Sequence, residues 1–396
     1  MANGTVKDGY PRHRFFYALF RPPVRLFTRL FFGYRVKQVQ RLPGPSFVLC
    51  NHNSPYDMLF IGSTIRDQMY YVAGDNVFRM GLVSRLMQWI FAPICRVKGS
   101  TDASSAMTIL RTLKKGRNVC MFPAGNCSYN GLPWPIHPTL GRMAKKTGVN
   151  LVTFRTSGVY FFGPRWSHTT RRGPMSGEIV HVYTPEDLKQ MTAEEVYDAI
   201  VQDLYEDSYA EQERKRYRYK GKKRAEWLET ALCLCPRCGR LDTLRSEGNV
   251  FTCHACGLRV EYGEDGFFHG PELPFRNVRD WDSWQAGKLD ELAEKAGDEP
   301  VFSDEDMKLF AIDGDLNMTL ADTGTLSLSR SALQLGNTVF PLPELTKLDM
   351  ALQCRILIAR DGVNYEIRRD TPWNARKYAH LFQYWKAHPA EEPVTE

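Results

Sequence analysis

The chain has 396 residues, of which 43% are hydrophobic and 24% are charged, and its formal net charge is +7. This balance is ordinary for globular protein and excludes a mostly disordered chain or a polytopic membrane protein. The length predicts two or three domains. No apolar run reaches the roughly 18 residues of a spanning helix, and the opening segment MANGTVKDGY lacks the apolar core of a secretory signal. We therefore expect a protein that does not cross the bilayer.

The positive charge is concentrated near the start of the chain. No Asp or Glu occurs between Gly9 and Tyr56. Eight cations lie there among Phe, Tyr and Leu: Arg12, Arg14, Arg21, Arg25, Arg29, Arg35, Lys37 and Arg41. Such a segment suits the headgroup boundary of an anionic membrane, and the pair Pro22-Pro23 is expected to break it into two helices. The alternative is a pair of ordinary helices packed on the next domain.

Short apolar runs alternate with helical patterns between Leu42 and about Tyr183. The runs that predict strands are residues 46–50, 69–73, 93–97, 118–122, 149–154 and 178–182. Residues 104–115 predict a helix that ends at Gly116, and Thr184 and Thr192 are typical first residues of two further helices. Strand and helix in alternation predict an α/β fold with a largely parallel sheet.

The composition changes twice after this α/β region. Residues 211–224 form a charge run that indicates a boundary or an exposed helix, and residues 271–300 are polar and acid-rich. From Val301 onward, short alternating strands are separated by turn signals, and residues 372–387 predict a terminal helix. This part vaguely resembles a bacterial pleckstrin-homology-like domain, and we predict a β-rich accessory domain.

A histidine and an aspartate follow the first strand closely. His52 comes two residues after Cys50, and Asp57 comes five residues later across a turn that contains proline. A carboxylate in this position can fix the tautomer of the imidazole, which can then deprotonate a hydroxyl. Taken alone, a surface histidine near a structural aspartate is the commoner explanation of such a pair. The remaining motifs decide between the two interpretations.

Four motifs in order resemble those of the PlsC-type glycerolipid acyltransferases, the 1-acylglycerol-3-phosphate acyltransferase family, over roughly residues 35–204. Asn51, His52, Ser54 and Asp57 match the family motif NHxSxxD in full. Residues 92–96 resemble the second motif, a strand that ends in arginine, here Arg96. Residues 122–128 resemble the third motif, FPEGTRS, and residues 149–153 resemble the fourth, an apolar strand.

The resemblance implies that His52 takes the proton of an acceptor hydroxyl, which attacks the thioester of acyl-CoA or acyl carrier protein, and that Asp57 supports the imidazolium. The turn at residues 124–126 offers backbone N–H groups to the developing oxyanion. Arg96 and Lys98 would face an anionic acceptor, unless Arg96 is a plain surface cation. The substrate-binding residues implied in this way are Asn51, Ser54, Arg96, Lys98, Pro123, Gly125, Asn126 and Ser128.

Two residues depart from the third motif. The family's glutamate is Ala124 here, and its arginine is Cys127. The missing arginine removes a charge-assisted phosphate contact. The motifs therefore specify the type of reaction more closely than the acceptor. Two functions therefore stand against each other. The first is an acyltransferase that acts on a lysophospholipid, with 1-acylglycerol-3-phosphate the favoured acceptor. The second is a non-catalytic protein that uses the same fold to bind a membrane or nucleic acid.

Two CxxCG knuckles, separated by fourteen residues, follow the charge run. Their cysteines are Cys235, Cys238, Cys253 and Cys256. Four thiolates on two tight turns are typical of a closed, structural Zn²⁺ site, and redox-active CxxC pairs are the competing interpretation. A zinc ribbon beside basic residues also suits nucleic acid, which we consider a less favoured partner than an anionic lipid surface.

These observations predict a peripheral, monotopic protein on the cytoplasmic face of the cell membrane. The expected segments are a basic membrane-interface segment (1–40), an acyltransferase domain (41–210), a basic linker (211–228), a zinc ribbon (229–262), a second linker (263–300) and the accessory domain (301–396).

Overall fold

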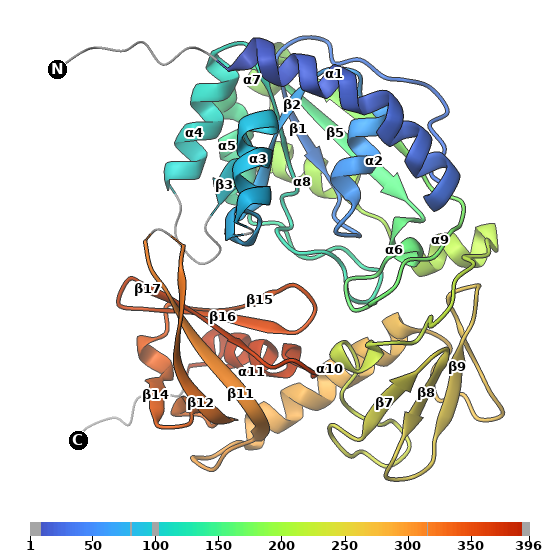
Figure 1. Cartoon of the computed structure of the whole chain (residues 1–396), viewed down its shortest axis with the longest axis vertical. Helices are drawn as coiled ribbons and strands as arrows, with labels where there is room; N and C mark the ends of the chain where they lie inside the picture. Colours follow the sequence, from blue (N-terminus) through green and yellow to red (C-terminus); the bar gives the residue numbers. More distant parts are fainter. Residues whose placement is uncertain (1–8, 80, 97–102, 315, 390–396) are drawn as a thin grey trace. The chain divides into compact units, whose positions relative to one another are not determined.

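The computed structural model describes residues 9–79, 81–96, 103–314 and 316–389 (Figure 1). Contacts divide the chain into two compact units. The first unit contains most of the chain up to Lys220, and the second contains residues 165–169 and the chain from Gly221 onward. None of the described helices combines the length and the apolar character that crossing a bilayer requires.

The first unit is built around a mixed sheet of six strands in the order β3-β2-β4-β1-β5-β6. The strands are β1 (Ser46–Cys50), β2 (Met69–Gly74), β3 (Ile94–Arg96), β4 (Asn118–Met121), β5 (Asn150–Ser157) and β6 (Ser176–Tyr183). All neighbouring pairs are parallel except β5 and β6. The prediction of an α/β fold is therefore confirmed, and every predicted strand is present within a few residues, although Val97 lies outside the described residues.

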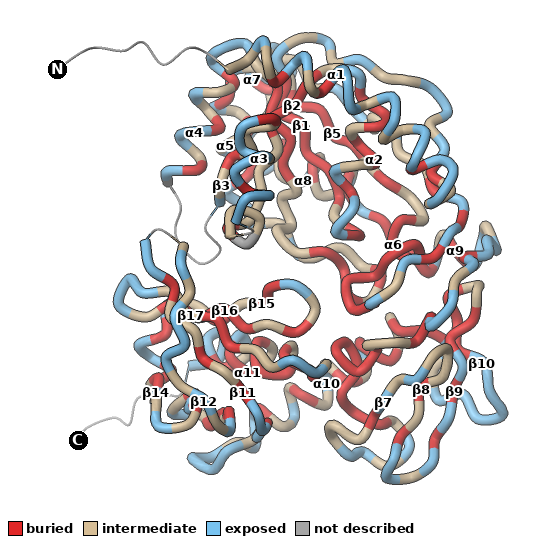
Figure 2. Tube along the Cα trace, in the orientation of Figure 1, coloured by how far each residue is buried: buried red, intermediate tan, exposed pale blue. Residues whose placement is uncertain are grey.

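Helices cover both faces of this sheet, and the strand pattern explains why. Side chains alternate along β1, so that Phe47 and Leu49 face one core and Val48 and Cys50 face another. The first core is closed by α4, α5, α7 and α8, and the second by α2. These layers bury β1, β4 and most of β5, as Figure 2 shows. The helices are α1 (Tyr10–Phe27), α2 (Asp57–Thr64), α3 (Leu82–Phe91), α4 (Ala103–Lys114), α5 (Thr139–Thr147), α6 (Val159–Phe162), α7 (Pro185–Gln190), α8 (Ala193–Leu204) and α9 (Ser208–Lys215), with short turns η1 (Thr28–Phe32) and η2 (Asp75–Arg79).

The predicted break at Pro22-Pro23 is wrong, because α1 continues through both prolines and ends in the π-helical turn η1. A proline inside a helix removes a backbone hydrogen bond and costs about 3 kcal/mol. Tertiary contacts offset this cost. Tyr17 donates to the carbonyl of Ile65, and Arg21 donates to the carbonyls of Ser63 and Ile65. These bonds fasten α1 along α2 (Figure 1).

The second unit contains two antiparallel sheets and two long helices. The smaller sheet has the strand order β10-β9-β8-β7, and the larger has the order β14-β13-β12-β11-β17-β16-β15. The elements are η3 (Leu228–Thr230), β7 (Leu244–Glu247), β8 (Val250–Cys253), β9 (Arg259–Tyr262), β10 (Phe268–His269), α10 (Val278–Lys295), β11 (Phe302–Ile312), β12 (Met318–Leu328), β13 (Ala332–Leu335), β14 (Thr338–Pro341), η4 (Leu342–Glu344), β15 (Lys347–Ala351), β16 (Arg355–Arg360), β17 (Val363–Arg368) and α11 (Arg376–Ala387). The prediction of a β-rich C-terminal part is confirmed.

Part of the predicted second linker is helical. Asn277 caps α10, whose residues Trp281, Gln285 and Leu289 are buried at helical spacing. The indole of Trp281 donates to the carbonyl of Leu234 at 2.9 Å. This helix therefore anchors the first cysteine knuckle, and among its acidic residues Glu291 and Glu294 are exposed whereas Asp282 is buried.

Candidate active site

The loop between β1 and α2 holds His52 and Asp57 in contact. Asp57 is the first residue of α2 and is fully buried. Its Oδ2 lies 2.8 Å from His52 Nδ1 and also accepts from the backbone N–H groups of Asn53 at 2.8 Å and Ser54 at 3.0 Å. The carboxylate thus fixes both the loop and the ring, so that Nδ1 is engaged and Nε2 remains for proton transfer.

The loop after β4 completes the surroundings of the imidazole. Because β4 is the parallel neighbour of β1, their carboxyl ends open at the same edge of the sheet. Phe122 stacks on the ring of His52 with centroids 4.5 Å apart, and the N–H of Ser128 donates to the carbonyl of His52 at 3.0 Å. Cys127 Sγ lies 3.3 Å from Nε2 and 3.5 Å from Nδ1. The first and third motifs therefore meet at one imidazole.

This environment raises the pKa of His52. Burial alone would lower the pKa, but the charge of the Cys127 sulfur and the hydrogen bond with Asp57 raise it from 6.5 to about 10. At neutral pH the imidazole of the free site therefore holds its proton. It can act as a base only after that proton has been passed on.

Three of the predicted substrate-binding residues are buried, and their side chains interact with other residues of the protein. The amide of Asn51 exchanges hydrogen bonds with Thr156 on β5. Ser54 is fully buried, and the hydroxyl of Ser128 accepts from the N–H of Gly131 at 2.8 Å. The geometry favours a positioning role for these three side chains over the predicted substrate contact.

The other predicted residues lie nearer the surface. Pro123, Gly125 and Asn126 are partly exposed in the turn after β4. The N–H of Gly125 donates to the carbonyl of Phe122 at 3.1 Å, so it is engaged within the turn and is not the free oxyanion donor that we expected. Arg96, at the end of β3, is exposed, and a Cβ added at Gly125 would lie 3.8 Å from its Nη1. Lys98 lies outside the described residues.

Sequence reasoning missed a buried carboxylate beneath the motif. Glu206 accepts from the amides of Asn51 and Asn53 and from the N–H of Gly158 at 3.2 Å. It thereby joins the first motif to the end of β5. No local pattern marks this residue, because it follows α8 and lies 153 positions from Asn53 along the chain. Only the folded topology brings the two together.

The buried position of Glu206 gives a testable pH dependence. Burial, which outweighs the hydrogen bonds from Gly158 and Asn53, raises the pKa of Glu206 from 4.5 to about 7. The folded protein then binds this proton more tightly than the unfolded chain, so the stabilisation is complete below pH 4.5 and is lost as the pH rises through 7. Between pH 4.5 and pH 8 we expect the free energy of unfolding to fall by an amount on the order of 3 kcal/mol.

Glu206→Gln should remove most of this dependence of the unfolding free energy on pH. Glu178→Gln, which changes an exposed carboxylate, should leave the dependence unchanged. Urea unfolding at pH 5 and pH 8 measures the difference. A Glu206→Gln protein with the same pH dependence as the wild type would show that this carboxyl stays ionised.

An aromatic cluster connects the N-terminal segment to the catalytic loop. Phe32 of η1 packs against Tyr56 and Phe162, with centroid distances of 5.7 and 4.6 Å. Tyr56 directly precedes Asp57. The basic N-terminal segment is therefore a part of the first unit that reaches the edge of the site.

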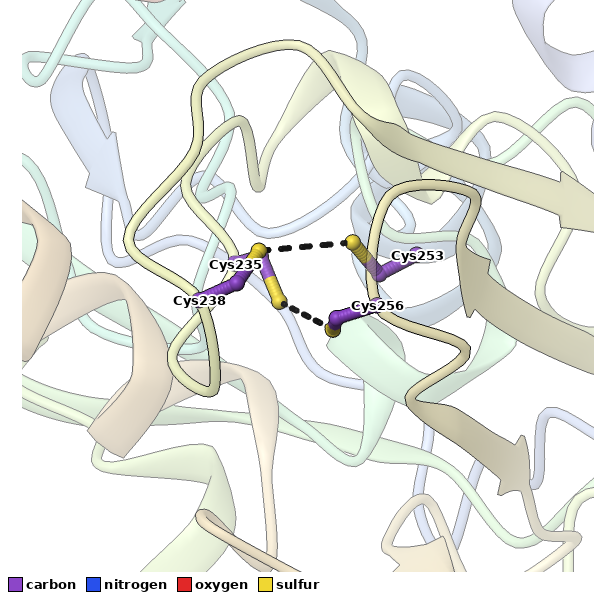
Figure 3. A group of neighbouring side chains, drawn as sticks. All are labelled: Cys235, Cys238, Cys253 and Cys256. Atoms are coloured by element: carbon purple, nitrogen blue, oxygen red, sulfur yellow. Dashed lines mark hydrogen bonds between the residues drawn. The ribbon is translucent and has the colours of Figure 1, made fainter.

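The four cysteines of the two knuckles converge in the second unit (Figure 3). All four sulfurs lie within 4.8 Å of one another, with Cys235 and Cys256 at 3.6 Å and Cys238 and Cys253 at 3.8 Å. The two knuckles are alike, because Gly239 donates to the carbonyl of Cys235 and Gly257 to that of Cys253, both at 2.9 Å. Sulfurs around a tetrahedral metal at about 2.3 Å would be about 3.8 Å apart, so the cluster can hold one metal ion.

One family model matches the segment that carries most of the motifs. A search of curated proteins finds no significant match for this chain. Among solved structures, the chain is similar to the 1-acyl-sn-glycerophosphate (LPA) acyltransferase PlsC from Thermotoga maritima, with 18% sequence identity, a TM-score of 0.43, and coverage of 53% of this chain and 84% of that one. Residues 33–157, which include all of the contacts made by His52 and Asp57, match the family described as Acyltransferase. Through these residues the chain is similar to the acyltransferase family, in agreement with its PlsC-type motifs.

Proposed function

We propose that this protein transfers a fatty acyl chain from acyl-CoA or acyl carrier protein to the hydroxyl of a lysophospholipid, with 1-acylglycerol-3-phosphate as the favoured acceptor. The observation that supports this most strongly is the contact of 2.8 Å between His52 and the buried carboxylate of Asp57 at the carboxyl edge of the sheet. An imidazole held in this way is suited to move a proton between a hydroxyl and a leaving thiol. The family match supports the same reaction.

The position of Arg96 supports an anionic acceptor. Its exposed guanidinium lies beside Gly125, in the turn that precedes Cys127. A charge-assisted contact with a phosphate contributes about 1.5–3 kcal/mol. Because Cys127 stands where the family has arginine, Arg96 is the cation that we assign to the acceptor's phosphate.

Replacing Arg96 by alanine should therefore raise the KM for 1-acylglycerol-3-phosphate about tenfold to a hundredfold, and should affect an uncharged monoacylglycerol much less. The exposed Arg111 on α4 supplies the matched control, Arg111→Ala. Steady-state kinetics with both acceptors measures the effect. Equal losses with the charged and the uncharged acceptor would contradict a phosphate contact.

An exposed apolar surface on α1, η1 and α3 supports docking on a membrane. We call it the interfacial patch, and its residues are Phe15, Leu19, Leu26, Phe27, Leu30, Phe31, Leu82, Val83, Leu86 and Trp89. The two helices are joined by a ring contact of 5.3 Å between Phe16 and Trp89. Arg14 and Arg29 are exposed on the same segment, so rings can enter the acyl edge while guanidinium groups reach phosphates.

The sharpest test leaves α1 in place, because Tyr17 and Arg21 fasten it to the core. We expect the triple variant Phe15→Ser, Phe31→Ser, Leu82→Ser to lose most of its binding to anionic vesicles. The matched control replaces three exposed apolar residues of the second unit: Leu320→Ser, Val339→Ser, Val363→Ser. Cosedimentation at low and high salt measures the apolar and the electrostatic contributions to vesicle binding, and the electrostatic contribution should weaken with salt. Equal binding by the two triple variants would place the membrane contact elsewhere.

We further propose that the four clustered cysteines bind one structural Zn²⁺. Four thiolates leave no open coordination position, so the ion would stabilise the fold of the second unit and take no part in the reaction. Two of the sulfur separations, 3.6 and 3.8 Å, are close to the value of about 3.8 Å expected around a tetrahedral ion, which supports this proposal.

The competing function is a non-catalytic binding protein, and the observation that favours it is the loss of the third-motif glutamate and arginine at Ala124 and Cys127. The intact pair of His52 and Asp57 argues against it, since a binding protein has no need of a buried carboxylate that orients an imidazole.

A further inference from the structure

We propose that a pocket beside the start of α1 binds the head group of an anionic phospholipid that carries hydroxyl groups, of the chemical class of phosphatidylglycerol. This lipid is neither the acyl donor nor the acceptor, so the proposal goes beyond the reaction proposed above and does not depend on it. The bound head group adds a specific lipid contact to the apolar contact of the interfacial patch.

The pocket has a volume of about 560 Å³, and its wall is rich in arginine. Pockets of about 300–1,000 Å³ are the size that small ligands occupy. Arg14, Arg41 and Arg66 line this one, and all three are exposed. Within the described part of the chain, no carboxylate forms an ion pair with any of them. Their guanidinium groups therefore remain available to a phosphate, which they can bind through charge-assisted hydrogen bonds.

Backbone hydrogen bonds hold two of these arginines together. The N–H of Arg66 donates to the carbonyl of Gln40 at 2.9 Å, and Asp67 Oδ2 accepts from the N–H of Leu42 at 2.9 Å. These bonds fasten the residues on both sides of Arg41 to the segment that contains Arg66. Asp67 also lines the pocket, but its carboxylate is engaged with the backbone, and three guanidinium groups outweigh its charge. The pocket therefore favours an anion.

An unbonded amide oxygen indicates a second requirement of the ligand. Gln68 lines the pocket directly before β2, and it is only 8% exposed. Its Oε1 is buried and has no hydrogen-bond partner among the described residues. A buried acceptor without a donor is costly, and a hydroxyl group in the pocket supplies that donor. A head group with both a phosphate and hydroxyls thus matches the arginines and the amide together.

The position of Phe15 favours a lipid over a free phosphate ester. This ring is 62% exposed, and it belongs both to the wall of the pocket and to the interfacial patch. The acyl chains of a lipid whose head group occupies the pocket can therefore continue over the patch. A soluble phosphate ester leaves the same apolar residues in water.

The pocket and the catalytic pair lie at opposite edges of the sheet. Gln68 precedes β2 whereas His52 follows β1, and both strands are parallel to β4. The 18 residues of α1 span about 27 Å from the pocket toward η1, whose Phe32 packs against Tyr56 beside the catalytic loop. In a lysophospholipid the reacting hydroxyl is only a few bonds from the phosphate. A lipid held in the pocket is therefore not the acceptor.

The test compares binding of the full-length protein to phosphatidylcholine vesicles that contain equal fractions of phosphatidylglycerol or of phosphatidylmethanol. Both anionic lipids carry one negative charge, and only phosphatidylglycerol has hydroxyls in its head group. We expect the wild type to bind the phosphatidylglycerol vesicles about tenfold more tightly. Gln68→Met, which keeps the size of the side chain but removes Oε1, should bind the two kinds of vesicle equally.

A second pair of variants tests the arginines. The double variant Arg41→Gln, Arg66→Gln should lose the preference for phosphatidylglycerol. The matched control is Arg29→Gln, Arg35→Gln, which removes two exposed charges of the same basic segment outside the lining of the pocket. This control should weaken binding to both kinds of vesicle alike and should keep the preference.

Equal binding of the wild type to the two kinds of vesicle, or a pocket variant that behaves like its control, would overturn the site. Glycerol 3-phosphate and CoA are added as soluble competitors. If either one removes the preference for phosphatidylglycerol, the pocket belongs to a soluble phosphate ester or to the acyl donor, and the lipid assignment is wrong. The binding measurements involve no turnover, so their outcome is independent of whether the protein transfers acyl chains.

Discussion

Replacing His52 by alanine is expected to reduce acyl transfer at least about 10³-fold while leaving the fold unchanged. His52 is the group through which every proton of the reaction would pass, since it is the imidazole that lies within 2.8 Å of Asp57 and 3.3 Å of Cys127. Its side chain is still 19% exposed, so alanine leaves a small gap at the edge of the core. Transfer of labelled acyl chains, measured beside thermal unfolding, separates chemistry from stability.

Two comparisons sharpen this prediction. Asp57→Asn should cost about a hundredfold or more, because the amide no longer supplies the negative charge that stabilises the imidazolium. His181→Ala is the control, since His181 also neighbours an aspartate, Asp203, at 3.9 Å. Its side chain is 59% exposed, and it lies on β6, outside the loops that hold His52 and Asp57. A His52→Ala protein with normal turnover would contradict the role of His52 in proton transfer, whatever the other variants show.

Removing the metal, or replacing Cys235 by serine, is expected to unfold much of the second unit. Structural zinc in small modules contributes about 10–16 kcal/mol of apparent binding free energy, and this energy is folding energy. The knuckle is also joined to its surroundings. Trp281 donates to Leu234 next to Cys235, and the fully buried Lys377 of α11 pairs with Asp242 and with Asp304. Loss of the knuckle therefore exposes partners on α10, α11 and β11.

We expect metal analysis to find one zinc per chain, and we expect a chelator to lower the unfolding temperature of the second unit while the first unit keeps its own transition. Cys233→Ala is the matched control, because Cys233 is two residues away yet hydrogen-bonds Gln285 instead of joining the cluster. Less than half an equivalent of metal in freshly purified protein, or an unchanged Cys235→Ser transition, would contradict a structural zinc site.

The parts of the fold that could be predicted from sequence are those whose physics is local. The apolar runs predicted the central strands, because a strand that is buried on both faces is apolar at consecutive positions. In β1 this is the run from Phe47 to Cys50. Thr184 and Thr192 predicted helix starts because their hydroxyls cap the next turn, and both form capping boxes. The spacing of the two CxxCG knuckles predicted a cluster whose four sulfurs the structure brings together.

What could not be predicted depends on contacts between distant segments. Pro22-Pro23 looked like a helix break because proline opposes helix locally, and only the bonds from Tyr17 and Arg21 to α2 show why the helix continues. Glu206 carries no sequence signal because its partners are far away in the chain. Cys127 looked like the loss of an arginine, and its contact with Nε2 of His52 becomes visible only when β1 and β4 lie side by side.

The most direct test of the central claim is to incubate the purified full-length protein with labelled acyl-CoA, anionic vesicles and a panel of lysophospholipids that includes 1-acylglycerol-3-phosphate. We predict a labelled diacyl lipid, formed fastest from 1-acylglycerol-3-phosphate and absent with His52→Ala. If the zinc-loaded, vesicle-bound wild type forms no labelled lipid from any acceptor, with acyl-CoA or acyl carrier protein as donor, the protein is not an acyltransferase of this kind.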